Sequence, residues 1–157
     1  MIYEVLDPKE NATPIGPYSP GLKLGDFLYI SGQLGIDAEG NLVGDDIQSQ
    51  TLQVISNLAN VLAEANLEMR HLVKTTVYLA DMKYYEEFNL IYATYLAHPY
   101  PARSVVAVAG LPKGALVEIE AFAIDTLRYE ELNPESVYGC DCGDMVDCED
   151  CETGCFD

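Results

Sequence analysis

Charged side chains inside two apolar, strand-like segments are the residues of this chain best suited to chemistry. Arg103 stands at the start of a mainly apolar run that ends at residue 109. Glu118 and Glu120 lie within residues 116–124, which are otherwise apolar. A guanidinium presents two parallel N–H donors that match a carboxylate, and a glutamate can take a proton from water and return it later. Together these groups could bind a small anion and exchange protons with it.

The turn-forming sequence Gly-Leu-Pro-Lys-Gly separates the two segments and predicts a β-hairpin. If the turn is centred near Leu111 and Pro112, Glu118 falls opposite Val105 and diagonal to Arg103. Side-chain alternation then puts the two charged groups on one face, about 7–8 Å apart, and the gap could hold a small anion. A register slip of one residue would break this alignment.

The same pattern fits a purely structural role equally well. Buried charges are costly unless they are paired, so Arg103 and Glu118 could form a partly buried ion pair that stabilises the hairpin. By strand alternation Glu120 faces the same side as Glu118. The pattern does not decide between the two glutamates.

Hydrophobic periodicity elsewhere predicts the elements that must position these residues. Residues 27–31 form a short, apolar, β-prone run, and alternating apolar and polar residues predict another strand at 73–79. Apolar residues recur at helical spacing over 47–65, after two aspartates, which predicts a helix of about five turns. A second helix is expected at about 84–97, where apolar residues again recur at helical spacing. The prolines that follow would end it.

The order of these elements predicts an α+β fold in which both helices pack on one face of a mixed β-sheet. The other face of the sheet would then remain partly apolar and open to water. Because a large exposed apolar surface is a liability for a monomer, we expect oligomerisation to cover that face.

Charge divides the 157-residue chain into two parts. All eight Lys and Arg lie at or before Arg128, whereas residues 129–157 contain ten of the 26 acidic residues. We therefore expect one domain at 1–128 and an acidic, Cys-rich, flexible tail at 129–157. The tail holds all five cysteines: Cys140, Cys142, Cys148, Cys151 and Cys155. Such thiols could alternatively bind a metal or dock a partner, although their spacing fits no standard zinc template and we assign no metal ligand.

Charge and hydropathy argue against two classes of partner. At a net charge of −18, with both parts of the chain acidic, a phosphate backbone would be repelled, so we expect no nucleic-acid partner. The sequence has no apolar run of about 18 residues and no basic leader. We therefore expect no membrane partner and a cytoplasmic location.

Short motifs along the domain are typical of one protein family. They are Ile15-Gly-Pro-Tyr18-Ser-Pro-Gly21, Leu28-Tyr-Ile-Ser31-Gly32-Gln33, Val73-Lys-Thr-Thr-Val77, Asn89, Pro101-Ala-Arg-Ser104, Leu111-Pro-Lys-Gly114 and Val117-Glu-Ile-Glu-Ala121. By these motifs the chain resembles the RidA family, also called the YjgF-like proteins, over about residues 3–126. The resemblance covers nothing of the tail.

The resemblance implies a chorismate-mutase-like (RidA) fold that assembles as a homotrimer with equivalent clefts between its subunits. The family hydrolyses reactive enamine and imine intermediates, such as 2-aminoacrylate and 2-iminobutanoate, to 2-keto acids and ammonia, and it needs no cofactor. In this chain Arg103 would clamp the substrate carboxylate and Glu118 would activate a water. The implied partners are small 2-imino and 2-enamino acids and further copies of the chain.

By the same match, five further residues would contact the substrate. Tyr18, Ser31 and Gly32 would approach from the neighbouring subunit. Asn89 would add an amide contact, and the backbone of Val105 could also reach the substrate. Many relatives have a cysteine at the position that Val105 occupies in this chain. Because a valine cannot act as a nucleophile, a mechanism that uses a thiol there is excluded for this chain.

Two other functions remain open from the sequence. One is a non-catalytic regulatory protein that binds small 2-keto acids through Arg103. The other is a protein that binds a metal or a partner through its Cys-rich tail. Turnover of an imine substrate would distinguish the deaminase from both.

Overall fold

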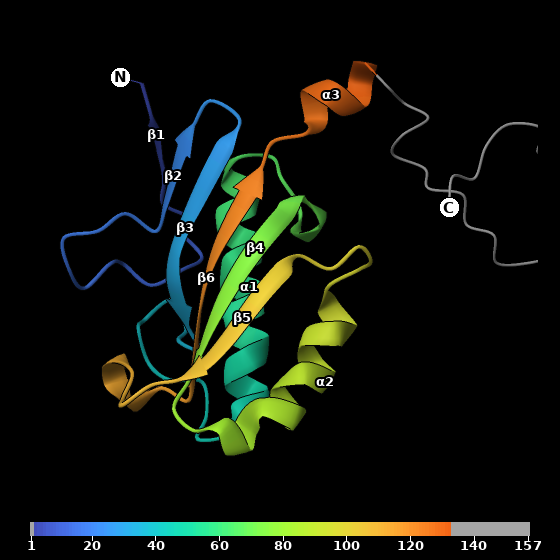
Figure 1. Cartoon of the computed structure of the whole chain (residues 1–157). Coiled ribbons are helices and arrows are strands. Elements are labelled where there is room, and N and C mark those ends of the chain that lie inside the picture. Colours follow the sequence, from blue (N-terminus) through green and yellow to red (C-terminus); the bar gives the residue numbers. More distant parts are fainter. Residues whose placement is uncertain (1, 133–157) are drawn as a thin grey trace, which may run out of the picture. The chain divides into compact units, whose positions relative to one another are not determined.

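A six-stranded mixed sheet forms the centre of the first unit of the chain, residues 1–126 (Figure 1). The computed structural model describes residues 2–132. The strand order across the sheet is β1-β2-β3-β6-β4-β5. The strands are β1 (Glu4–Leu6), β2 (Gly21–Leu24), β3 (Phe27–Leu34), β4 (Leu72–Leu79), β5 (Ala102–Ala107) and β6 (Val117–Ile124). The helices of this unit are α1 (Ile47–Glu64) and α2 (Tyr85–Tyr95), with 3-10 turns at Met69–His71, Met82–Tyr84 and Pro112–Gly114.

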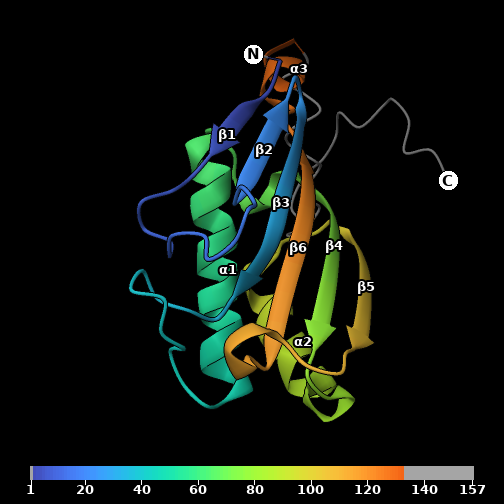
Figure 2. The same cartoon turned by 90° about the vertical axis from the view of Figure 1, so that its left-hand side faces the viewer.

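The two helices cover the same face of the sheet, as predicted (Figure 2). α1 begins after Asp46, whose carboxylate accepts a hydrogen bond from the Ser49 N–H at 2.7 Å. Its 18 residues confirm the predicted length of about five turns. Val54, Leu58 and Val61 of this helix are fully buried. Burial of this apolar stripe against the sheet is what drives the helix onto it.

The predicted hairpin between residues 103–109 and 116–124 is wrong. β5 lies at the edge of the sheet and pairs in parallel with β4, whereas β6 lies between β3 and β4 and is antiparallel to both. A parallel pair needs a crossover connection, and α2 lies in that connection. The Gly/Pro sequence at 110–114 contains a 3-10 turn and carries the chain from β5 past β4 to β6. It therefore does not join neighbouring strands.

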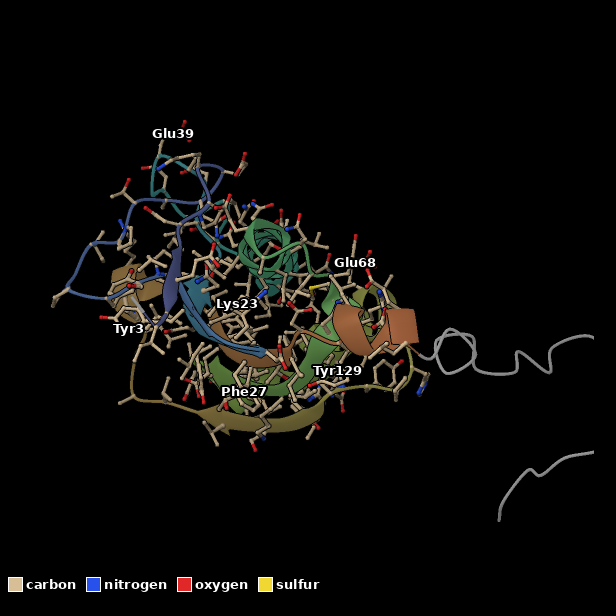
Figure 3. All side chains as sticks on the ribbon, turned by 90° about the horizontal axis from the view of Figure 1, so that it is seen from above. Tyr3, Lys23, Phe27, Glu39, Glu68 and Tyr129 are labelled. Atoms are coloured by element: carbon tan, nitrogen blue, oxygen red, sulfur yellow. The ribbon has the colours of Figure 1, made fainter. Side chains whose placement is uncertain are left out.

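The face of the sheet opposite the helices is partly apolar, as expected. Phe27 and Tyr29, which alternate with the buried Leu28 and Ile30, are 48% and 53% exposed on this face. Their ring centroids lie 5.9 and 5.0 Å from that of Phe122. In Figure 3, α1 lies on one side of the sheet and Phe27 on the other. That another copy of the chain covers this open face stays a prediction.

The second unit comprises residues 127–157, of which residues 127–132 are described. These form a short helix, α3 (Leu127–Leu132), that the sequence pattern did not predict. The five cysteines lie outside the described residues, so the predicted tail at 129–157 and its metal interpretation stay predictions. Over residues 2–132, no group of His, Cys, Asp and Glu side chains could hold a metal ion. No helix in that range is long and apolar enough to cross a membrane.

Candidate functional site

Arg103 and Glu118 project from opposite faces of the sheet, which contradicts the predicted alignment. Arg103 lies beside Thr75 of β4, and Glu118 lies beside Tyr78 of the same strand. Residues three apart on a strand point to opposite faces. The buried Thr75 faces the helices, so Arg103 does as well, whereas Glu118 faces the open side. One chain therefore carries two half-sites, which we call the Arg103 half-site and the Glu118 half-site.

The Arg103 half-site is built on aromatic residues of α2. The guanidinium carbon of Arg103 lies 4.7 Å from the ring centroid of Tyr92 and 5.7 Å from that of Phe88. Both rings are buried, and the hydroxyls of Tyr92 and Thr75 are hydrogen-bonded at 2.7 Å. A cation is attracted to the faces of aromatic rings. The rings therefore hold the guanidinium in place without a carboxylate beside it.

Arg103 and Asn89 share a pocket on this side of the sheet. Its volume is about 430 Å³, and it is lined by Asn89, Tyr92, Ala93, Tyr100, Pro101 and Arg103. Of the carboxylates that the structure describes, none pairs with Arg103, and within the same range the buried amide oxygen of Asn89 accepts no hydrogen bond. A ligand with a carboxylate and an N–H group would satisfy both. Val105 faces the same side as Arg103 but does not line this pocket.

The Glu118 half-site is built around a bulge in β3. The β3–β6 register shifts by one residue at Ser31 and Gly32, so that both lie opposite Glu120. A methyl group on Gly32 would overlap the carboxylate of Glu118. Glycine therefore makes room for Glu118 to lie across the β3 backbone. Glu118 and Gly32 meet within one chain, whereas the sequence prediction assigned them to neighbouring subunits.

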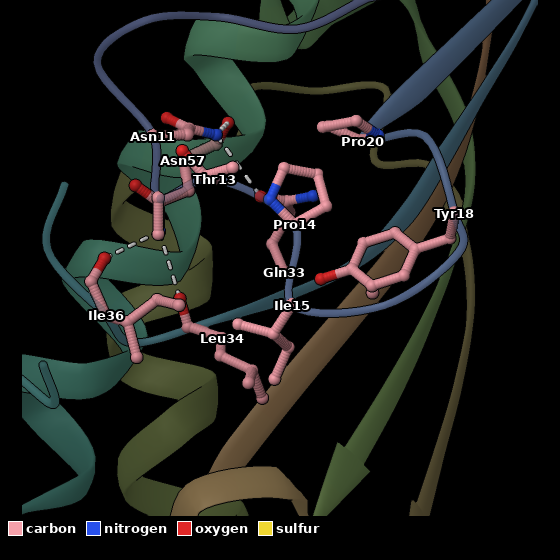
Figure 4. A pocket seen from close by; sticks show the side chains of 12 residues that line it. Asn11, Thr13, Pro14, Ile15, Tyr18, Pro20, Gln33, Leu34, Ile36 and Asn57 are labelled. Carbon is pink, nitrogen blue, oxygen red and sulfur yellow. Dashed lines mark hydrogen bonds between the residues drawn. The ribbon is translucent and has the colours of Figure 1, made fainter. Parts of the chain in front are cut away.

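Ser31 ties the loop before β2 to this bulge. Its hydroxyl donates a hydrogen bond to the Ser19 carbonyl at 2.7 Å, and its N–H donates to the Pro20 carbonyl at 2.9 Å. Tyr18 belongs to the same loop, and with Gly32 it lines a small cavity of about 40 Å³ (Figure 4). The structure therefore brings Tyr18, Ser31 and Gly32 close together within one chain, and their approach to a substrate from the neighbouring subunit stays a prediction. Ser31 has a structural role here, and its oxygen can still accept a hydrogen bond.

A buried amide network, which sequence reasoning missed, holds this loop in place. Asn11 donates to the side-chain oxygen of Gln33 at 3.2 Å and to the Asn57 carbonyl at 3.0 Å. Asn60 donates to the side-chain oxygen of Asn11 at 2.8 Å. These amides come from a loop, a strand and a helix, so no local spacing marks them as partners. Tyr92 was missed for a related reason, because its helical spacing predicts only a core residue.

Electrostatics distinguishes Glu118 from an ordinary surface glutamate. Burial raises the pKa of Glu118, and the neighbouring charge of Glu120 raises it further. A carboxyl with a raised pKa exchanges its proton nearer to neutral pH, as a general base and acid must. The chain therefore presents an arginine held by aromatic rings on one face and a glutamate with a raised pKa on the other.

Comparisons with known proteins bear on both half-sites. The sequence model of the family described as Endoribonuclease L-PSP matches residues 9–125. A RutC family protein from Pyrococcus abyssi is 42% identical over 124 residues, 78% of this chain and 98% of the relative. The 2-iminobutanoate/2-iminopropanoate deaminase of Mus musculus is 40% identical over 125 residues, 79% of this chain and 93% of the relative. The crystal structure of E. coli TdcF with bound serine is 30% identical, with a TM-score of 0.73, and the match covers 77% of this chain and 98% of that one.

The family match spans strands β2 to β6 of the sheet, both helices packed on it and every residue of the two half-sites. The solved structures share this arrangement of a mixed sheet with helices on one face. The chain therefore belongs to the Endoribonuclease L-PSP family, which comprises the RidA or YjgF-like proteins.

Proposed function

We propose that the protein is a hydrolytic deaminase of reactive enamine and imine intermediates. It converts substrates such as 2-aminoacrylate and 2-iminobutanoate to 2-keto acids and ammonia, without a cofactor. The name of the mouse relative supports this reaction, and the serine bound to E. coli TdcF supports a small ligand with a carboxylate.

The observation that carries this proposal is the unpaired guanidinium of Arg103. The chain has 26 acidic residues and a net charge of −18, yet no carboxylate in the described range pairs with this arginine. Aromatic rings hold it at a pocket instead. A guanidinium fixed in this way suits bidentate binding of a substrate carboxylate, for which a lysine would be a poor substitute.

We further propose that each site is shared between two copies of the chain in a homotrimer. The two half-sites face away from each other in one chain, so a single copy cannot offer both to one small substrate. The partly apolar open face supports a contact between copies, because exposed apolar patches mark interaction surfaces. The Arg103 half-site of one copy then meets the Glu118 half-site of its neighbour.

The reaction follows from the chemistry of the two groups. Arg103 binds the carboxylate of the imine with two hydrogen bonds and fixes the C=N carbon near Glu118. Glu118 takes a proton from water, and the hydroxide adds to that carbon. Glu118 returns the proton to the nitrogen, which gives a carbinolamine. It then moves the hydroxyl proton to the nitrogen as the C–N bond breaks, leaving the 2-keto acid and ammonia.

Ribonuclease activity, which the description of the family names, is not what we propose for this chain. Affinity for RNA depends on cations that displace the counterions around phosphates. This chain has eight Lys and Arg against 26 Asp and Glu. We propose that this charge balance keeps nucleic acid away from the site.

A coupled assay tests the deaminase function. A pyridoxal-phosphate-dependent threonine dehydratase supplies 2-iminobutanoate, and release of 2-ketobutanoate is followed with and without the protein. We expect the wild-type protein to accelerate release and Arg103→Ala to lose this effect. No acceleration, or full activity of Arg103→Ala, would overturn the proposal. Binding of 2-ketobutanoate without turnover would instead identify a regulatory protein.

A further inference from the structure

Two glutamates and a tyrosine share the open face of the sheet at the Glu118 half-site. Glu118 and Glu120 stand two residues apart on β6, so they point to the same side. Tyr78 of β4 lies directly beside Glu118 in the register of the two strands. Its hydroxyl nevertheless donates a hydrogen bond to Oε1 of Glu120, at 3.1 Å. The hydroxyl of Tyr78 therefore donates its single hydrogen bond to the diagonal carboxylate, that of Glu120.

The surroundings leave Glu118 without a comparable donor. On β3 its register partner is Leu34 and its carboxylate lies against Gly32, while its row ends at Val106 of β5, and none of these three residues titrates. Lys74 lies on the same face, but its ammonium donates to the hydroxyl of Ser104 at 2.8 Å. Within residues 2–132, Glu118 accepts no hydrogen bond and forms no ion pair.

We propose that Tyr78 gives the two glutamates unlike roles: its hydrogen bond fixes the carboxylate of Glu120 in place and leaves Glu118 as the carboxylate that carries the proton. This inference rests on the proposed deaminase function. Tyr78 and Glu120 are positioning residues, because they act through Glu118 and not on the substrate. The arrangement decides between the two glutamates, which strand alternation alone could not do.

Electrostatics separates the two carboxylates. The charge of one carboxylate disfavours ionisation of a neighbouring carboxyl. The charge of Glu120 accordingly adds to burial in raising the pKa of Glu118. Burial, the hydrogen bond to Glu120 and the charges of both glutamates raise the pKa of Tyr78. The phenol therefore keeps its proton and stays a donor while Glu118 titrates.

The variant Glu120→Gln tests this division of roles, because it keeps an acceptor for the Tyr78 hydroxyl and removes the charge. We expect the acidic limb of the kcat profile to move to lower pH. The titration of the Glu118 carboxyl carbon, followed by NMR, should move in the same direction. KM should stay within about twofold of the wild-type value. Glu64→Gln, at an exposed position at the end of α1, is the matched control and should leave both curves in place.

A second variant, Tyr78→Phe, removes the donor itself. We expect a several-fold lower kcat, an unchanged KM and a broader Glu118 titration, because the carboxylate of Glu120 is then no longer fixed relative to Glu118. An unmoved Glu118 titration in Glu120→Gln would overturn this inference even if the enzyme is active. Absence of deaminase activity in the wild-type protein would overturn the proposed function instead, so the two failures are distinguishable.

Discussion

The two half-sites of this protein are held by different means. In the Arg103 half-site, side chains do the positioning, because the rings of Phe88 and Tyr92 fix a cation and a hydroxyl pair fixes one of the rings. In the Glu118 half-site, the backbone does it, because a bulge and Gly32 make room for a carboxylate. This difference fits the roles proposed above, in which Arg103 binds a charged group and Glu118 must lie in one place to move a proton. Changes in the first half should weaken binding, and changes in the second should slow the reaction.

The largest expected effects are kinetic, and they test whether the two half-sites respond differently to substitution. Glu118→Gln is expected to lower kcat by about 10²- to 10⁴-fold with little change in KM, which is the usual contribution of general acid–base catalysis. Arg103→Ala should chiefly raise KM, because it removes binding of a carboxylate that is present before and during the reaction. Steady-state kinetics in the coupled assay measures both. A rise in KM alone for Glu118→Gln would contradict its assigned role.

A single methyl group tests the backbone half more sharply. In Gly32→Ala the new methyl overlaps the Glu118 carboxylate, which must move. We expect kcat to fall by about tenfold or more, because misplaced catalytic groups lose much of their effect. Gly110→Ala is the matched control, since a methyl there meets nothing within 4 Å. Equal kcat values for the two variants would show that the position of Glu118 does not matter.

The smallest effect concerns stability. Burial and the charge of Glu120 raise the pKa of Glu118 in the folded protein, so the folded state binds this proton more tightly than the unfolded chain does. Stability is therefore lost as the pH rises through the raised pKa, and Glu118→Gln removes that loss. We expect its Tm to exceed the wild-type Tm by no more than about 2 °C at about pH 8 and to match it at about pH 4. Thermal denaturation at fixed protein concentration measures this, and a difference that does not depend on pH would speak against a raised pKa.

Local features of the fold could be predicted from the sequence because their signals are local. The apolar spacing of α1, its Asp46 cap and the alternation along β4 all correspond to the observed elements. The three- and four-residue strands β1 and β2 are too short to show a period. The Gly/Pro turn signal at 110–114 led to the wrong prediction of a hairpin, because such a signal does not reveal that the chain passes over another strand. The strand–helix–strand order of β4, α2 and β5 was the better guide, since such units pair in parallel.

The sequence grouped three residues of the candidate site correctly but did not predict the geometry of the site, and their contact with a substrate stays a prediction. Family motifs pointed to Tyr18, Ser31 and Gly32, which the structure brings together. The overlap between Gly32 and Glu118 depends on a one-residue register shift, and no local pattern encodes such a shift. The bond from Tyr78 to the second glutamate likewise depends on which strands are neighbours.

Mixing two impaired variants tests the proposal of a shared site most directly. Arg103→Ala and Glu118→Gln chains are dissociated and reassembled in equal amounts, so that about a quarter of the clefts combine two intact half-sites from neighbouring copies. At substrate concentrations below the wild-type KM, where each variant alone is nearly inactive, we predict that the mixture regains about a quarter of the wild-type activity in the coupled assay. A mixture as inactive as its two components would contradict a site built from two chains.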